Sequence, residues 1–92
     1  RKNMKDTVIE DKGGTFWYKE GTDILHRKNG PACEYADGSK AYYIDGKSHR
    51  LDGPALEYSD GTKYWYIHGL KLTEEEFKKI VELKSILKSL GI

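Results

Sequence analysis

The 92-residue sequence contains one cysteine, two prolines and no long hydrophobic run. Because Cys33 has no second cysteine to pair with, a framework of internal disulfides is excluded. No apolar stretch approaches the roughly 18 residues that cross a membrane, and no signal-peptide pattern is present. We therefore expect a soluble, cytoplasmic protein without a membrane partner.

An excess of charge of one sign is also missing. Sixteen Lys and Arg residues oppose fifteen Asp and Glu residues, which leaves a net charge of +1. A protein that binds phosphate groups usually gathers its basic residues on one face, whereas both signs are balanced along this chain. The balance argues against a surface built for phosphate, and the length predicts one small domain.

In place of these features the sequence has a 23-residue unit written twice without a gap. The first copy, residues 26–48, reads H-R-K-N-G-P-A-C-E-Y-A-D-G-S-K-A-Y-Y-I-D-G-K-S, and the second, residues 49–71, reads H-R-L-D-G-P-A-L-E-Y-S-D-G-T-K-Y-W-Y-I-H-G-L-K. Thirteen of the 23 positions are identical, which indicates a tandem repeat. The predicted organisation of the single domain, 1–92, is a frayed end (1–7), a degenerate repeat (8–25), two full repeats (26–48 and 49–71) and a capping helix (72–92).

Each full repeat carries the turn signals of a β-hairpin. Asp37-Gly38 and Asp60-Gly61 separate short runs rich in Tyr, Trp and Ile, and an Asp-Gly pair supplies the positive φ angles of a two-residue type I′ turn. We expect strands at 32–36, 39–44, 55–59 and 62–67. The predicted fold is mainly β (β+α), an antiparallel β-meander of tandem hairpin repeats with about six strands and one C-terminal amphipathic helix.

A two-residue turn sets the register of each hairpin and divides the side chains between two faces. It places Cys33 opposite Tyr42, and Leu56 opposite Trp65. The face that we expect to be buried, as an aromatic core, consists of Trp17, Cys33, Tyr35, Tyr42, Ile44, Leu56, Tyr58, Trp65 and Ile67. The face that we expect to be exposed consists of Phe16, Tyr18, Glu34, Tyr43, Glu57, Tyr64 and Tyr66. A register error of one residue would exchange these sets.

Beyond Lys71 the hydrophobic period changes from 2 to 3.6 residues. Thr73 and Glu76 have the spacing of a capping box, and the acids at 74–76 suit the positive end of a helix dipole. We expect a helix from Thr73 to Leu90 that ends at Gly91. Its apolar stripe needs a partner surface, either the sheet or a second copy of the chain, so a homodimer stays an open alternative.

The repeat phrases resemble MORN-type repeats. The phrases are D-G-x-K-x-x-Y-I-x-G and H-R-x-x-G-P-A, and with the 23-residue period they look like the divergent variety found in bacterial and viral proteins. The unit followed by G-x-K-L-T-E-E-E-F at residues 69–77 is similar to small proteins of tailed phages and large DNA viruses. This resemblance implies a binding module, for example a phage accessory protein that binds or inhibits a host protein in the host cytoplasm.

No catalytic or metal-binding motif stands in the sequence. None of the candidate metal ligands, His26, His49, His68 and Cys33, has a partner two to five residues away as zinc pairs do. Neither a G-x-S-x-G motif nor a P-loop glycine pattern is present. We therefore expect no enzymatic activity, no cofactor and no metal.

The predicted binding site is the exposed tyrosine-rich face with the arginine of each repeat, because Tyr and Arg are enriched at interface hot spots. It consists of Tyr18, Arg27, Tyr43, Arg50, Tyr64 and Tyr66. The alternative function is binding of single-stranded nucleic acid by stacking, with Lys40 and Lys63 nearby, although Glu34 and Glu57 would repel phosphates there. An alternative reading of the His-Arg pairs at 26–27 and 49–50 is structural, with each arginine paired to Glu34, Glu57 or Asp52.

Overall fold

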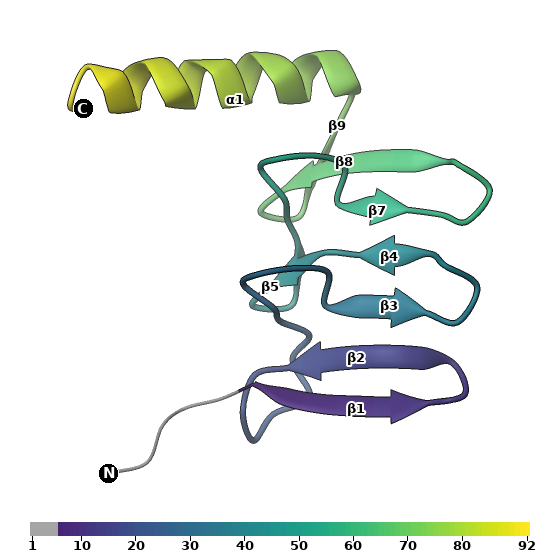
Figure 1. Ribbon diagram of the computed structural model, residues 1–92. Helices are drawn as coiled ribbons and strands as arrows, with labels where there is room; N and C mark the ends of the chain where they lie inside the picture. Colours follow the sequence, from purple (N-terminus) through teal and green to yellow (C-terminus); the bar gives the residue numbers. More distant parts are fainter. Residues whose placement is uncertain (1–5) are drawn as a thin grey trace, which may run out of the picture.

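In the computed structural model, which describes residues 6–92, the chain forms a stack of β-hairpins closed at one end by a helix (Figure 1). The predicted frayed end at 1–7 lies outside the described residues for positions 1–5, and Thr7 already begins the first strand. The elements are β1 (Thr7–Asp11), β2 (Gly14–Tyr18), β3 (Cys33–Tyr35), β4 (Lys40–Ala41), β5 (Tyr43–Ile44), β6 (Lys47–Ser48), β7 (Leu56–Glu57), β8 (Lys63–Ile67), β9 (Leu70–Leu72) and α1 (Glu74–Ser89).

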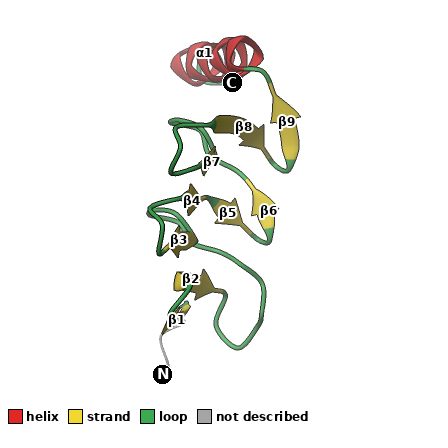
Figure 2. Cartoon of the chain, turned by 90° about the vertical axis from the view of Figure 1, so that its right-hand side faces the viewer, coloured by secondary structure: helices red, strands yellow, loops and turns green. Residues whose placement is uncertain are grey.

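The strands form an antiparallel meander. Within residues 6–92 one seven-stranded sheet has the order β1-β2-β3-β4-β7-β8-β9, and β5 pairs with β6 beside it. Figure 2 shows β6 and β9, the strands that end the two repeats, on the same side of the molecule. The predicted fold class is confirmed. Because neighbours in the sheet are also close in sequence, each unit contacts mainly the units next to it.

The hairpin loops at Asp37-Gly38 and Asp60-Gly61 contain three residues, not two. The Gly38 N–H donates to the Tyr35 carbonyl at 3.0 Å, and the Tyr35 N–H donates to the Ser39 carbonyl at 2.9 Å. This arrangement is a turn followed by a glycine at positive φ, here 94° at Gly38. As a result Cys33 pairs with Ala41, so the predicted pairing of Cys33 with Tyr42 is wrong.

The two-residue turns lie instead at the next break of each repeat. Asp45 and Gly46 have φ angles of 52° and 80°, and His68 and Gly69 have 50° and 81°. Positive φ at both central residues is the signature of a type I′ turn, the geometry that matches the twist of a tight hairpin. These turns join β5 to β6 and β8 to β9.

The shift of one residue rearranges the two faces of the sheet. Cross-strand partners share a face, and the row of partners running across the sheet is Phe16, Cys33, Ala41, Leu56 and Tyr64. Phe16 and Tyr64 were expected on the exposed face, but they lie on the same face as Cys33 and Leu56 and pair with them across the strands. Trp17, Tyr42 and Trp65, expected in the core, lie on the face of Glu34 and Glu57 by strand alternation.

Small side chains fill the interior. The buried apolar residues among those described are Ala32, Cys33, Ala41, Ala55 and Phe77. Tyr35 and Tyr58, predicted core residues, are 42% and 47% exposed. The molecule measures 43 × 42 × 16 Å, so residues 6–92 are about one layer thick and place no second layer over the rings. The prediction of an aromatic core is therefore wrong.

Helix α1 closes the stack beside β8 and β9, and Figure 1 shows its C-terminal part extending beyond the sheet. Thr73 is the N-cap, and the capping box with Glu76 is confirmed by both of its hydrogen bonds. Leu90 is the C-cap, so the predicted bounds are correct. Phe77 is buried, whereas Leu83 is 56% exposed, so the sheet covers only the first part of the apolar stripe. A second copy as the partner of the remainder stays a prediction, which sedimentation velocity decides.

Candidate functional site

On one face of the sheet, each repeated arginine joins two successive units. The Arg27 guanidinium carbon lies 3.7 Å from the centroid of the Trp17 ring in the preceding unit. Its Nη1 donates to the Pro31 carbonyl at 3.1 Å and to Glu34 Oε2 at 3.4 Å. The arginine thus stacks on one unit and binds the backbone of the next, a geometry that suits its planar group.

Arg50 repeats these contacts one unit further along. Its guanidinium carbon lies 3.9 Å from the Tyr42 ring centroid, and Nη1 donates to the Pro54 carbonyl at 3.1 Å and to Glu57 at 3.4 Å. Its Nε donates to Asp52 at 2.8 Å. The structural interpretation of the arginines is confirmed by these contacts, while their part in binding stays a prediction.

The repeated histidines accept backbone hydrogen bonds from the type I′ turns. His26 Nδ1 accepts the N–H of Asp45 at 2.9 Å, and His49 Nδ1 accepts the N–H of His68 at the same distance. Asp45 also forms an ion pair with Lys19. Each histidine therefore fixes the tight turn of its own repeat, and an acceptor nitrogen must carry no proton.

His49 and His68 stack with their ring centroids 4.3 Å apart and their planes at 29°. Burial lowers the pKa of His49 below its ordinary value, and the nearby His68 and Lys84 lower it further. Above about pH 6.5 His49 is neutral in both the folded and the unfolded chain, so it adds no pH dependence. Below that pH the unfolded chain takes up the proton first, and the free energy of unfolding falls.

We therefore expect acidification from pH 7.5 to pH 5 to destabilise the wild-type protein more than the variant His49→Gln, because glutamine keeps an acceptor but does not titrate. Urea unfolding at both pH values measures the difference. The matched variant His68→Asp copies the Asp45 of the first repeat and should reduce the acid-induced loss, because a carboxylate favours the protonated imidazole. An identical loss in all three proteins would contradict this account of His49.

The opposite face of the sheet carries most of the tyrosines, and we call it the tyrosine face. It bears the row from Phe16 to Tyr64, and strand alternation adds Tyr18 and Tyr66 to it. Its aromatic members are Phe16, Tyr18, Tyr35, Tyr43, Tyr58, Tyr64 and Tyr66. Glu34 and Glu57 are absent from it, because they pair across the strands with Lys40 on the face that carries Arg27 and Arg50. We call that face the arginine side.

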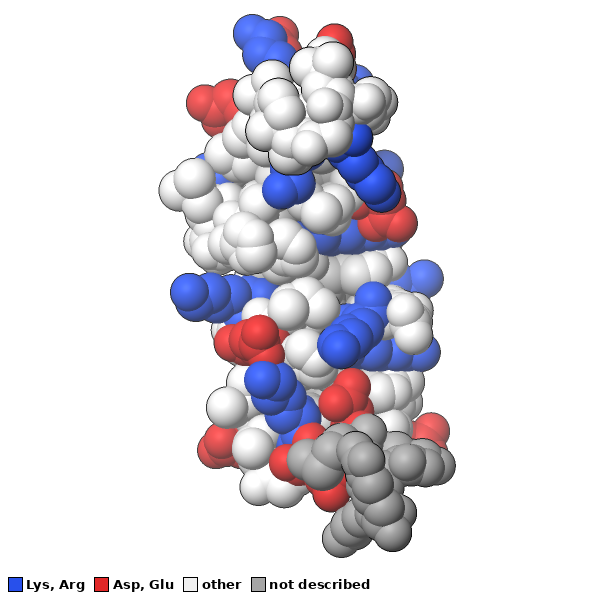
Figure 3. Space-filling model, turned by 90° about the vertical axis from the view of Figure 1, so that its left-hand side faces the viewer, with Lys and Arg blue, Asp and Glu red and all other residues white. Residues whose placement is uncertain are grey.

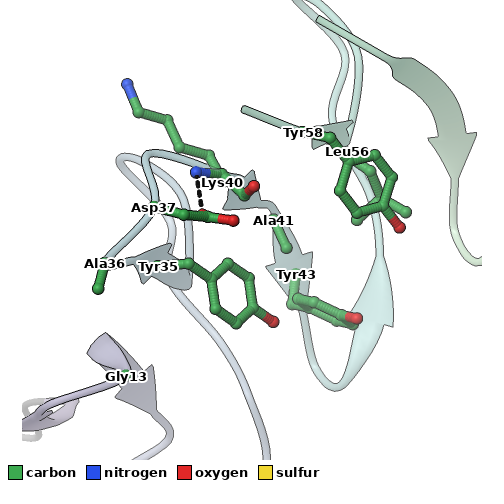
Figure 4. A pocket seen from close by; sticks show the side chains of 10 residues that line it. Gly13, Tyr35, Ala36, Asp37, Lys40, Ala41, Tyr43, Leu56 and Tyr58 are labelled. Carbon is green, nitrogen blue, oxygen red and sulfur yellow. Dashed lines mark hydrogen bonds between the residues drawn. The ribbon is translucent and has the colours of Figure 1, made fainter. Parts of the chain in front are cut away.

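A hollow of about 490 Å³ opens in the middle of the tyrosine face. Its walls include Tyr35, Tyr43 and Tyr58, and Ala41 and Leu56 lie between them. Figure 4 shows the three rings arranged around Ala41, with the Lys40 side chain pointing away. This hollow, at the junction of the two full repeats, is the candidate binding site.

The hollow exists because one repeat has alanine where its neighbours have a ring. Phe16, Ala41 and Tyr64 occupy the equivalent place in the three units. Phe16 packs edge-on against Tyr35 with centroids 5.6 Å apart, and Tyr64 packs edge-on against Tyr58 at 5.9 Å. Ala41 has no ring to offer, so the space between Tyr35 and Tyr58 stays open.

Burial raises the pKa of two ionisable groups at the hollow, Cys33 and Tyr35. Burial raises the pKa of the Cys33 thiol, which lies beneath the face and is 1% exposed. Burial also raises the pKa of Tyr35 to about 12, with the neighbouring Cys33 adding to the shift. Both groups therefore keep their protons at neutral pH, and the thiolate that a cysteine nucleophile requires is suppressed.

Of the predicted site residues, Tyr43 lines the hollow and Tyr64 supports its wall through Tyr58. Tyr18 and Tyr66 lie on the same face, whereas Arg27 and Arg50 lie on the opposite one. All six side chains are partly buried. Four residues of the hollow were not predicted as site residues: Tyr35, Ala41, Leu56 and Tyr58. The signal that marks them is the alanine at 41, where the second copy has tyrosine.

Across residues 6–92, no group of three or more His, Cys, Asp or Glu side chains is arranged to hold a metal ion. Over the same residues, no helix has both the length and the hydrophobicity that a membrane crossing requires. No protein-family model matches the chain, and comparisons with curated proteins and with solved structures also find no match.

Proposed function

We propose that this protein is a non-enzymatic protein-binding repeat module that recognises its partner through the tyrosine face. The observation that carries the proposal is the hollow of about 490 Å³, lined by three tyrosines and open to solvent. Tyrosine supplies a large, rigid contact area with a polar tip, which is why it is enriched at protein interfaces. The similarity of the repeat phrases to MORN-type repeats supports the role of a phage or viral accessory protein that binds or inhibits a host protein.

The second candidate function is binding of single-stranded nucleic acid by base stacking. One observation favours it: the Lys71 ammonium lies 4.4 Å from the Tyr64 ring centroid. Glu34 and Glu57 lie off the tyrosine face, but Lys40 and Lys63 pair with them across the strands and therefore lie off it too. Against it, the charges of the chain nearly balance, and Figure 3 shows basic and acidic side chains interspersed along the edge of the sheet that it displays. A backbone-tracking groove needs basic residues in a continuous strip, so protein binding is favoured.

Affinity capture from the cytosol of the native host, followed by titration of the captured protein, tests the first function. Changing Tyr35 and Tyr58 together to Ser should weaken binding by roughly 2 kcal/mol or more, about 30-fold, because these exposed rings form the walls of the hollow. The matched control is Leu70→Ser, since Leu70 is 64% exposed and pairs with Ile67 on the arginine side. Equal weakening by the control would contradict recognition through the tyrosine face.

The wild type and the double variant of Tyr35 and Tyr58 also test the binding of single-stranded nucleic acid. Mixed-sequence single-stranded DNA and RNA are titrated at about 50 mM and about 200 mM salt, a range over which phosphate contacts lose much of their affinity. Binding that falls steeply with salt and disappears in the Tyr35→Ser, Tyr58→Ser double variant would favour nucleic acid. No binding at the lower salt concentration would remove this candidate.

A further inference from the structure

We propose that the hollow at Ala41 binds one planar aromatic side chain of the partner, carried next to a basic residue. This inference rests on the proposed protein-binding function and specifies the chemistry that the hollow recognises. It follows from three features of the described chain: the internal precedents for a ring at this place, the open walls, and the charge at the rim.

The molecule itself shows what fits at the equivalent place. In the first unit the ring of Phe16 meets Tyr35 at 75° and 5.6 Å. In the third unit the ring of Tyr64 meets Tyr58 at 85° and 5.9 Å. Edge-to-face contacts at these distances are the favoured geometry of aromatic pairs. A ring from outside that stands over Ala41 would find Tyr35 on one side and Tyr58 on the other.

The walls of the hollow are exposed, so an aromatic side chain of a partner can reach them. Tyr35 and Tyr58 are 42% and 47% exposed, whereas Ala41 at the base is 3% exposed. The volume of about 490 Å³ lies in the range of pockets that hold small molecules, so it accommodates one aromatic side chain with part of its backbone. Ala41 and Leu56 form an apolar floor that a ring can cover.

The charge at the rim selects the neighbour of that ring. Asp37 lines the hollow, and its Oδ1 accepts the Ser39 N–H at 2.8 Å. This hydrogen bond holds the pKa of the Asp37 carboxyl below its ordinary value, so the rim is negative at neutral pH. Lys40 also lines the hollow, but its side chain points away from the three rings (Figure 4). A Lys or Arg beside the aromatic residue of the partner would complement this carboxylate.

Three tripeptides, acetylated and amidated at their ends, test the inference on the full chain: Lys-Trp-Lys, Lys-Leu-Lys and Glu-Trp-Glu. Titration followed by amide chemical shifts should place the Lys-Trp-Lys site at Ala41, Tyr43 and Tyr58. The affinity for Lys-Trp-Lys should exceed that for Lys-Leu-Lys by about tenfold, from two added ring contacts. It should also exceed that for Glu-Trp-Glu, by a smaller factor that shrinks as salt is added, because the Asp37 carboxylate is exposed. Equal affinities, or shifts confined to another face, would overturn the inference.

Two variants of the hollow sharpen the test. Ala41→Tyr fills the hollow as Tyr64 does in the next repeat and should lose Lys-Trp-Lys binding, while the matched control Ala41→Ser keeps the space and the binding. Tyr58→Leu removes one of the two rings beside Ala41 and should weaken Lys-Trp-Lys binding about fivefold, the value of one ring contact. Thermal melts verify that each variant is folded. If Ala41→Tyr does not fold, the affinity of Tyr58→Leu decides, and an affinity equal to that of the wild type overturns the inference.

Failure of this inference is distinguishable from failure of the proposed function. A captured host protein that binds Ala41→Tyr as tightly as wild type would contradict the binding of an aromatic side chain in the hollow and leave the protein-binding function in place. Absence of any captured protein, together with Lys-Trp-Lys binding that Ala41→Tyr abolishes, would leave the aromatic site in place and remove the function.

Discussion

Replacing Gly14 by alanine is expected to destabilise the protein by about 3 to 5 kcal/mol, the sum of a backbone clash and a strained φ angle. A Cβ at this position would lie 2.1 Å from the Glu34 carbonyl oxygen and 2.8 Å from the Tyr35 Cα. The φ angle of Gly14 is +139°, which side chains rarely adopt. Since both contacts are to the backbone of β3, no side-chain movement can relieve them, and β2 must separate from β3. Urea unfolding followed by tryptophan fluorescence measures the loss.

The matched control is Gly38→Ala. Gly38 also has a positive φ, +94°, but an added Cβ there meets nothing within 4 Å. It should therefore cost only the backbone strain, about 1 to 2 kcal/mol. Similar losses in the two variants would mean that β2 and β3 do not approach as closely as the pairing of Gly14 with Tyr35 requires.

Replacing Phe77 by alanine is expected to cost about 3 kcal/mol and to release α1 from the sheet. Phe77 is 7% exposed and is the buried residue of the helix, which contacts β8 and β9. Removing its ring leaves a cavity at the place where the helix is attached. Far-UV circular dichroism during urea unfolding reports the stability, and the fluorescence of Trp65 in β8 reports the loss of the helix from this end.

Leu83→Ala serves as the control on the same helix. Leu83 is 56% exposed, so its truncation should change the free energy of unfolding by no more than about 0.5 kcal/mol. An equal loss in Phe77→Ala and Leu83→Ala would show that the apolar stripe is covered along its length in solution. Covering by a second copy would then make the loss depend on protein concentration.

The sequence predicted the helix well because its signals are local. Thr73, Glu76 and Gly91 mark its ends through hydrogen bonds to backbone within one turn, and no distant contact can alter them. The hairpins were predicted for the same reason, from Gly at the turns. Their loop length was not predictable, since an Asp-Gly pair suits a two-residue turn and equally the last two positions of a three-residue loop.

That single ambiguity accounts for the wrong assignment of faces. One extra loop residue, Ala36 or Ser59, moves every side chain of the returning strand to the other side. Tyr42 then meets Arg50 and not Cys33. The sequence pattern also could not show that the sheet has a single layer, so large rings were assigned to a core that the small Ala32 and Ala55 fill instead.

The sequence predicted that the site would lie on an exposed aromatic face, but not which residues form it. Tyr43 and Tyr64 were assigned to an exposed aromatic face, and they do lie on the face that carries the hollow. Tyr35 and Tyr58, which form its walls, were assigned to the core because they share a face with Cys33 and Leu56, and the sequence did not show that no further layer covers their rings. The hollow depends on the ring that is absent at Ala41. The two copies show this difference in the sequence, but only the structure places Tyr35 and Tyr58 on either side of Ala41.

The contacts between successive repeats would let the array be lengthened, which a closed core would not allow. The arginine over the preceding ring and the histidine under the tight turn recur in each full copy, so a further 23-residue copy inserted at residue 49 would find ready-made partners on both sides. Whether that copy brought a hollow would depend on one codon, alanine or tyrosine, at the place of Ala41. The number of copies would therefore set the length of the array, and the residue at the place of Ala41 in each copy would set the number and position of the hollows.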